Sequence, residues 1–323
     1  MNILVTGGGG FIGFEAASKL KELGHNVAIL DKNPNEFRWA AARRKFIRIH
    51  ADVLDINILD FDDFKTEAII HCAAQTAATT GYKDPLGDFV TNARGTLEVC
   101  EFARKNDAQI IFTSSNKVYG DNVNKLALCL FPTRHDFAKV SAIDETFPID
   151  MTAHSPYGCS KLAADIYVQD YHHTYGLKTN VYRMSCIYGE SQTGTEDQGW
   201  VYHIINQMIN NKEVKIFGNG CQVRDILYVN DLIELMKLTL VKDISGVFNV
   251  GGGRERTISV IELMRFVNPE YTNYSFHPWR PADQKVYISN IQKARNVFGW
   301  EPQISFEEGL IRVINKLKLV KKK

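Results

Sequence analysis

The sequence lacks the features that would place the chain in a membrane or on nucleic acid. No apolar run among its 323 residues approaches the length of a transmembrane helix. The formal net charge is only +1, so no charge excess favours a nucleic acid or a membrane as partner. The first predicted strand begins at Asn2, which leaves no room for a signal peptide and predicts a cytoplasmic protein.

Paired cysteines and clusters of metal ligands are missing as well. The six cysteines stand far apart, at positions 72, 100, 129, 159, 186 and 221, without a CxxC pair. This spacing favours reduced thiols with mostly structural roles. His172 and His173 have no matching set of ligands, so we predict no metal site. A hydrophobic fraction of 45% nevertheless supports a sizeable core.

Residues 1–13, MNILVTGGGGFIG, are the most informative stretch that is present. The apolar run at residues 3–5 predicts a buried parallel strand, and Phe11–Leu23 predicts a helix. Between them, Gly7, Gly10 and Gly13 allow a tight turn, a close approach to a pyrophosphate and packing of the helix on the strand. The N–H groups that begin the helix favour a phosphate there. A tight turn without a ligand is the alternative.

A second predicted strand, Asn26–Leu30, ends at Asp31, where a carboxylate would bind the ribose diol of an adenosine. Strand and helix patterns then alternate, which predicts right-handed βαβ units and a parallel, doubly wound sheet. The further predicted strands are Phe46–His50, Ala68–Cys72, Gln109–Ser114 and Lys178–Met184. The further predicted helices are Asp88–Arg104 and Pro156–Tyr175.

Beyond about residue 186 the elements become shorter and turn signals cluster. We therefore expect a dinucleotide-binding domain over residues 1–185 and a smaller α/β lobe over residues 186–323, with some segments crossing back. Val229–Leu240 and Phe306–Lys318 are its predicted helices. Asp121–Asp144, a long connection with a short apolar piece at Leu126–Phe131, is more typical of a functional flap than of slack, and its role stays open.

A possible proton-transfer group stands at the fifth strand and the helix after it. Tyr157 and Lys161 are four residues apart, so they project from one helix face. A phenol titrates near ~10, and an ammonium or an oxidised nicotinamide nearby would favour its phenolate. Ser115, in the run TSSNKVYG, follows the fifth predicted strand and could orient a substrate hydroxyl. A surface pair is the alternative for the Tyr–Lys spacing alone.

With these motifs the chain resembles the extended short-chain dehydrogenase/reductases, within them the nucleotide-sugar epimerase/dehydratase family, over nearly its whole length. The resemblance implies a Rossmann-type doubly wound sheet with a C-terminal substrate lobe, catalytic Ser115, Tyr157 and Lys161, and NAD as cofactor. Asp31 favours NAD over NADP, although Lys32 stands beside it. The implied cofactor contacts are Gly7, Gly10, Phe11, Ile12, Gly13, Asp31, Lys32, Asp52, Val53, Ala73, Ala74, Gln75, Asn92, Ser114, Tyr157 and Lys161.

The resemblance also implies contacts to a nucleotide-diphosphate sugar. An arginine fork suits a diphosphate or a ribose, although an ordinary surface ion pair is the alternative for each arginine. The implied substrate contacts are Ser115, Asn116, Lys117, Ser185, Gln198, Gly199, Trp200, Arg224, Arg280 and Asp283. Relatives pair through two long helices, here Asp88–Arg104 and Pro156–Tyr175, so we expect a homodimer or homotetramer.

The residues after the fifth strand bear on the type of reaction. Family 4,6-dehydratases carry an Asp-Glu pair where this chain has Asn116 and Lys117, which disfavours a dehydratase. The NK pair, the run DQGW and the small residues Ser185 and Cys186 resemble the family's CDP-sugar 2-epimerases more than its UDP-hexose 4-epimerases. The chain departs from them at Leu162, at Cys221 and in most of residues 121–144, which leaves the sugar and the base open.

These residues lead to a hypothesis for the mechanism. Because a plain carbinol C–H is too weak an acid for a side chain, we expect Tyr157 to take the C2 hydroxyl proton while NAD accepts the hydride. The keto-sugar would turn and receive the hydride on its other face, with CDP favoured over UDP as its anchor. A UDP-hexose 4-epimerase, a reductase and a non-catalytic dinucleotide-binding protein are the alternatives.

Overall fold

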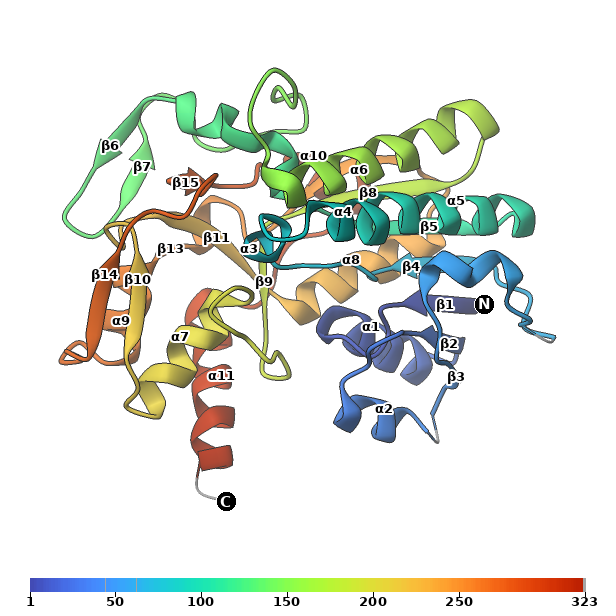
Figure 1. Cartoon of the computed structure of the whole chain (residues 1–323), viewed down its shortest axis with the longest axis horizontal. Helices are drawn as coiled ribbons and strands as arrows, with labels where there is room; N and C mark the ends of the chain where they lie inside the picture. The colour runs from blue at the N-terminus through green and yellow to red at the C-terminus, as the bar shows by residue number, and fades with distance from the viewer. Residues whose placement is uncertain (44, 62, 322–323) are drawn as a thin grey trace. The chain divides into compact units, whose positions relative to one another are not determined.

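The computed structural model describes residues 1–43, 45–61 and 63–321. This part of the chain separates into two compact units, each assembled from distant segments (Figure 1). The first unit comprises residues 1–118, 156–183 and 233–248, and the second comprises residues 119–155, 184–232 and 249–323. The division into domains at residue 185 stays a prediction. Within the described ranges, no helix is long and apolar enough to cross a membrane.

The first unit is built on a sheet whose pairings from β3 to β5 are parallel. Its described strands follow the order β12 (Gly246–Val250), β8 (Thr179–Met184), β5 (Gln109–Ser115), β4 (Ala68–His71), β1 (Asn2–Thr6), β2 (Asn26–Leu30) and β3 (Ile47–Ile49). Both faces of β4 and β5 are buried, which explains their near-continuous apolar runs. The expected doubly wound α/β fold is confirmed.

The strand register brings the candidate site residues to one edge of this sheet. Thr6 lies opposite both Leu30 and His71, and His71 lies opposite Phe112. The strands β1, β2 and β4 therefore end at the same level, and β5 continues beyond it to Ser115. The loops that follow them start side by side, where open α/β sheets place their ligands.

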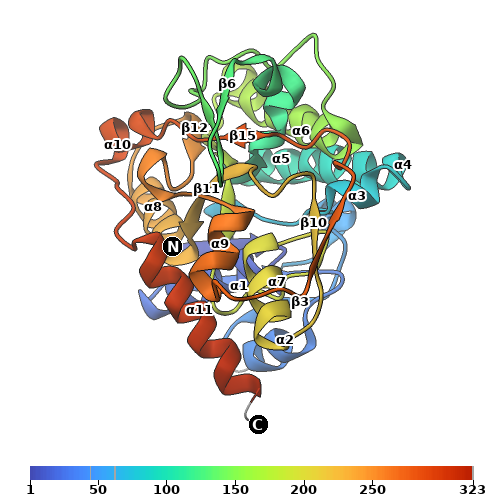
Figure 2. The same ribbon diagram turned by 90° about the vertical axis from the view of Figure 1, so that its left-hand side faces the viewer.

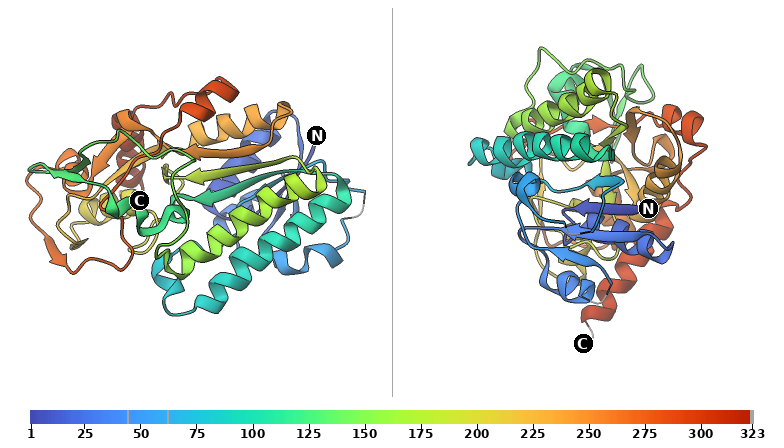
Figure 3. Two further views of the ribbon diagram at one scale, coloured as in Figure 1. Left: turned by 90° about the horizontal axis from the view of Figure 1, so that it is seen from above. Right: turned by 90° about the vertical axis from the view of Figure 1, so that its right-hand side faces the viewer.

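Helices cover both faces of the sheet. Figure 3 shows α5 (Gly95–Asn106) and α6 (Ser155–Tyr175) side by side over one face. Apolar side chains such as Val99 on α5 and Val168 on α6 pack with Ile110 of β5 in one buried cluster. Further helices of this unit are α1 (Phe11–Glu22), α2 (Glu36–Ala42), α3 (Ala78–Gly81), the 3-10 helix η1 (Val53–Ile58) and most of α8 (Val229–Val241).

The expected helix over Asp88–Arg104 is present, but it is not regular throughout. Its backbone stays helical from α4 (Pro85–Asp88) through a π-helical turn η2 (Phe89–Arg94) into α5. A π-turn widens the backbone by one residue, and such turns are frequent at functional sites. It carries the buried Asn92, whose contacts are described below.

The second unit contains small sheets and a helix cluster. Figure 2 shows α7 (Trp200–Ile209), α9 (Val260–Val267) and α11 (Phe306–Lys321) close together, and α7 packs against both α9 and α11. Its described strands are β6 (Leu128–Leu130), β7 (His135–Phe137), β9 (Cys186–Tyr188), β10 (Val214–Phe217), β11 (Val223–Tyr228), β13 (Thr257–Ser259), β14 (Tyr274–His277) and β15 (Val286–Tyr287). Its remaining described helices are η3 (Asn116–Lys125), η4 (Arg254–Arg256) and α10 (Gln292–Phe298).

Candidate active site

The glycine loop forms the tight turn that its sequence predicts. Gly7 has a φ of +67°, and its N–H donates to Leu30 O at 2.8 Å. A Cβ at Gly13 would lie 2.3 Å from Gly7 O, so only glycine lets α1 pack against this turn. A Cβ at Gly10 would meet only Gly7 O, at 3.1 Å. The loop thus leaves a cradle at the start of α1, where helix N–H groups lack intrahelical acceptors.

The acidic residue at the end of β2 is held in place by this loop. Asp31 accepts hydrogen bonds from Gly9 N at 3.0 Å and from Asn33 N at 2.9 Å. Lys32 pairs with Asp52 at 2.9 Å, and Asp52 also caps η1 by accepting from Leu54 N. The Asp52 carboxylate thereby neutralises the cation that stood nearest to Asp31 in the sequence.

The predicted cofactor contact Val53 has its side chain in the core. Its side chain is 4% exposed and belongs to the apolar core. Only its backbone could therefore contact a cofactor.

The loop after β4 is fixed by Asn92 from the π-turn. Asn92 Oδ1 accepts from Gln75 N at 2.8 Å, and Asn92 Nδ2 donates to Gln75 O at 3.1 Å. The same amide donates to Ser160 Oγ at 2.9 Å. Asn92 thus ties the loop of Ala73, Ala74 and Gln75 to α6. The site therefore fits a dinucleotide with a free ribose diol, which the glycine cradle, the Asp31 carboxylate and the loop after β4 would contact.

Ser115 of β5 lies close to Tyr157 of α6, near enough to influence the pKa of its phenol. The pKa of Tyr157 is raised to about 12, mainly because burial removes water from the phenol. A hydrogen bond from Ser115 lowers this pKa, and the charge of Asp88 raises it. The protein's own groups therefore raise this phenol pKa. The expectation that the Lys161 ammonium and an oxidised nicotinamide favour the phenolate of Tyr157 stays a prediction.

Lys161 lies one helical turn beyond Tyr157 and is 2% exposed. Its Nζ donates to Thr113 O at 2.7 Å and stands 4.3 Å from the centroid of the Phe112 ring. Burial lowers the pKa of Lys161 to about 8, while the charges of Cys72 and Asp165 act in the raising direction. The structure thus places Ser115, Tyr157 and Lys161 together between β5 and α6.

Asn116 and Lys117 follow Ser115 at the edge of the sheet. Asn116 is 7% exposed, and Ser115 Oγ lies 3.4 Å from its Oδ1. The backbone N–H of Lys117 donates to Ser115 Oγ at 3.2 Å. The serine hydroxyl is therefore oriented by its own chain neighbours.

The remaining predicted substrate contacts lie in the second unit. Several of their side chains form hydrogen bonds with other residues of the protein. Arg224 on β11 is 8% exposed and donates to Asp283 at 2.8 Å. Arg280 lies 3.8 Å above the Phe217 ring centroid and donates to Glu196 O. Such stacking pre-orients the guanidinium plane.

Other predicted contacts of this unit lie around β9 and α7. Ser185 donates to Asp225 O at 2.8 Å, so its hydroxyl has a partner within the protein. Gln198 N donates to Thr195 O in a turn before α7. Gly199 has a φ of +76°, and Trp200 Nε1 lies 3.3 Å from Cys186 Sγ.

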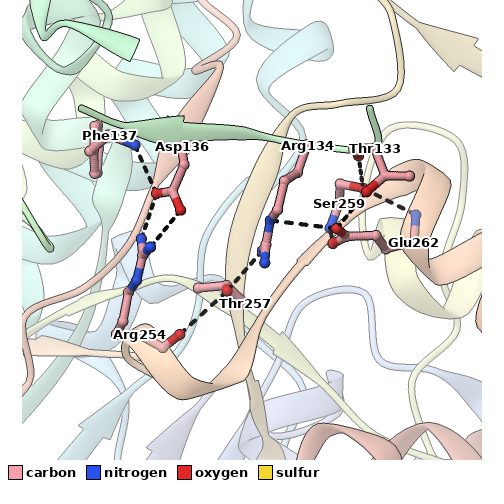
Figure 4. Close-up of polar contacts among 8 residues, drawn as sticks. All are labelled: Thr133, Arg134, Asp136, Phe137, Arg254, Thr257, Ser259 and Glu262. Carbon is pink, nitrogen blue, oxygen red and sulfur yellow. Dashed lines mark hydrogen bonds and ion pairs between the residues drawn. The ribbon is translucent and has the colours of Figure 1, made fainter. Parts of the chain in front are cut away.

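The long connection at residues 121–144 contains the β6–β7 hairpin, which is bonded to other segments of the second unit (Figure 4). Arg254 pairs with Asp136 through both guanidinium nitrogens, and Arg134 pairs with Glu262 at 3.5 Å. Ser259 Oγ donates to Thr133 O at 2.6 Å. These contacts make the hairpin a docked element of this unit.

Sequence reasoning missed Thr113, which holds Lys161. A backbone carbonyl acceptor leaves no side-chain signal, so only the register of β5 against α6 reveals this contact. It also missed His71, whose ring nitrogens lie 2.7 Å from Thr6 Oγ1 and 2.9 Å from Thr96 Oγ1. A histidine inside an apolar strand was the available signal, because a buried ring needs partners.

The parallel sheet, the glycine cradle and the Ser–Tyr–Lys group define an extended short-chain dehydrogenase/reductase. The model of the NAD dependent epimerase/dehydratase family matches residues 3–251. The chain belongs to this family and uses NAD as its cofactor.

Relatives and solved structures of this family cover nearly the whole chain. The chain is 35% identical to CDP-paratose 2-epimerase of Salmonella typhi, over 96% of this chain and 97% of that protein. It is similar to UDP-glucose 4-epimerase of Thermotoga maritima with UDP-glucose, with a TM-score of 0.86, 30% identity and coverage of 100% and 99%. It is also similar to UDP-glucose 4-epimerase of Thermus thermophilus in complex with NAD, with a TM-score of 0.85, 26% identity and coverage of 98% and 99%.

Proposed function

We propose that this protein inverts C2 of a CDP-linked sugar, as an epimerase of the CDP-paratose and CDP-tyvelose type. The observation that carries this proposal is the identity of the residues after Ser115. Asn116 and Lys117 provide no carboxylic acid where a dehydratase protonates its leaving hydroxyl. The 35% identity to CDP-paratose 2-epimerase supports the choice of C2 and of a CDP-sugar.

The reaction needs a group that can remove and return a hydride. When bound at the glycine cradle and Asp31, NAD supplies that reversible acceptor and, in its oxidised form, a positive ring. The protein's residues then handle the proton. Ser115 would hold the reacting hydroxyl, and Tyr157 would take its proton and, after the sugar has turned, return a proton to the same oxygen.

The pKa values explain why Tyr157 needs cationic help. A phenol with a pKa of about 12 is protonated at neutral pH, and ionising it there costs about 7 kcal/mol. The ammonium of Lys161 and the hydrogen bond from Ser115 both stabilise the phenolate. Arg224 and Arg280 would anchor the diphosphate, so that remote binding energy holds the keto-sugar while it turns.

The alternative function is a UDP-hexose 4-epimerase, which the likeness to the Thermotoga maritima enzyme favours. The same Ser–Tyr–Lys group would serve either carbon, because the chemistry at C2 and C4 is the same. A reductase or a dehydratase is a weaker alternative. We expect the protein to act in the cytoplasm, as a homodimer or homotetramer, in supplying sugars for polysaccharide biosynthesis.

The test offers purified protein a panel of CDP- and UDP-sugars without added NAD and follows the products by NMR. We expect inversion at C2 of a CDP-sugar, with no net NADH. Deuterium placed at C2 should remain in the product, because the hydride never mixes with solvent. Inversion at C4, an unsaturated 4-keto product or loss of the deuterium to water would contradict the proposal.

A further inference from the structure

Asp165, on the second turn of α6 beyond Tyr157, is a buried carboxylate outside the proton-transfer group. It has no exposed surface. Its Oδ2 accepts from Ser114 Oγ at 2.6 Å and from Arg183 Nε at 3.1 Å. Its Oδ1 accepts from Arg183 Nη2 at 3.1 Å and from Gln169 Nε2 at 2.6 Å. Four donors from three elements therefore satisfy this carboxylate.

The contact with Ser114 is one of three that join successive residues of β5 to α6. Thr113 O accepts from Lys161, Ser114 Oγ donates to Asp165, and Ser115 lies close to Tyr157. The three helix residues stand four apart, so they share one face of α6. We call this arrangement the β5–α6 ladder.

We propose that Asp165 is a positioning residue that sets the alignment of Tyr157 and Lys161 against Ser115. Asp165 contacts no reacting atom. The proposal rests on the proposed function only because it takes Ser115, Tyr157 and Lys161 as the reacting group. A buried ion pair is costly to desolvate, and packed apolar residues could stabilise α6 as well. The ion pair instead fixes the position of α6 relative to β8, because Arg183 of β8 donates two hydrogen bonds to the Asp165 carboxylate.

The charge of Asp165 has a second consequence, at Lys161. Lys161 faces His71 and Cys72 at the end of β4, and Asp165 on its own helix. Burial lowers the pKa of Lys161, and the Asp165 carboxylate acts in the opposite direction. Asp165 thus helps Lys161 to keep the proton that stabilises the phenolate.

The first test removes one rung of the ladder and leaves the ion pair intact. Ser114→Ala should lower kcat roughly 10- to 100-fold with nearly unchanged KM, because a small misplacement of reacting groups is costly. Bound NAD should remain although Ser114 is an implied cofactor contact, since its hydroxyl donates to Asp165 and its backbone is unchanged. Ser114→Thr keeps the hydroxyl and should restore most of the rate. Asp170→Asn, on the same helix but bonded only to Thr174 among described residues, is the matched control.

The second test replaces the ion pair by Asp165→Asn with Arg183→Gln, which keeps amide hydrogen bonding without unpaired charge. We expect a lower kcat, and an alkaline limb of the kcat–pH profile moved to lower pH, since Lys161 loses the attraction of Asp165. Rates are compared on whichever nucleotide sugar the wild type converts, so a wrong sugar would overturn the proposed function alone. Folded variants with wild-type kcat and pH profile would overturn the positioning role.

Discussion

The side-chain amide of Asn92 forms two hydrogen bonds with the backbone N–H and C=O of Gln75, as a neighbouring strand would in a sheet. Gln75 N donates to Asn92 Oδ1 at 2.8 Å, and Asn92 Nδ2 donates to Gln75 O at 3.1 Å. The π-turn gives Asn92 this reach, since it departs from the regular helix just before α5. The backbone of the loop after β4 is thereby fixed next to the glycine loop, where Ala73 N lies 3.4 Å from Thr6 Oγ1.

This pair predicts that Asn92→Ala weakens cofactor retention. The substitution leaves two backbone groups of Gln75 without their partner, which costs about 1–3 kcal/mol and predicts roughly 10- to 100-fold weaker NAD binding. The measurement is the NAD content of the purified variant and its NAD affinity by titration. Asn106→Ala on α5 is the control and should keep NAD, because the Asn106 side chain donates to Phe102 O, within its own helix.

The second prediction concerns the base. Tyr157→Phe keeps the ring and removes only the hydroxyl, so turnover should fall by about 10²- to 10⁴-fold. Bound NAD should remain, because the glycine cradle and Asp31 are untouched. Turnover is measured by NMR, and NAD content by absorbance after denaturation. Tyr167→Phe, an exposed phenol on the same helix, serves as control, and an active Tyr157→Phe enzyme would show that another group is the base.

The third prediction is a loss of activity on the alkaline side. Burial lowers the pKa of Lys161 to about 8, so the side chain is an ammonium below that pH and a neutral amine above it. Since the ammonium stabilises the phenolate, kcat/KM should fall as the pH rises through about 8. A profile measured from pH 6 to 10 on the free enzyme checks this. A rate that stays flat to pH 10 would argue against an ionised Lys161 in the reaction.

The fold was largely predictable, because its signals are local. The glycine loop, the apolar strands and the helix that carries Tyr157 follow from spacing alone, and β2 has the predicted bounds Asn26–Leu30. The π-turn at Phe89–Arg94 was not predictable. Its residues suit a regular helix, and only the tertiary contacts of Asn92 favour the wider turn.

The candidate site was predictable only where side chains act at short sequence distances. Tyr157 and Lys161 share a helix face. In contrast, Thr113 binds Lys161 through its backbone carbonyl, and Arg183 binds Asp165 from another strand. The partners of Arg224 and Ser185 depend likewise on how distant strands align. Long-range register decides these contacts, and a single sequence does not encode it in a visible pattern.

The last prediction compares two arginines that each hold a carboxylate with two nitrogens. The side chain of Arg183 is 4% exposed and pairs with fully buried Asp165, whereas that of Arg254 is 48% exposed and pairs with Asp136 on β7. Arg183→Met leaves a buried carboxylate uncompensated, so the free energy of unfolding should fall by about 3–5 kcal/mol. Arg254→Met leaves a carboxylate that water reaches more easily, and the loss should stay below about 1 kcal/mol. Urea denaturation at saturating NAD measures both. Adding Asp165→Leu to Arg183→Met should recover much of the loss, because the orphaned charge is gone, and equal losses for the two single variants would contradict the role of burial.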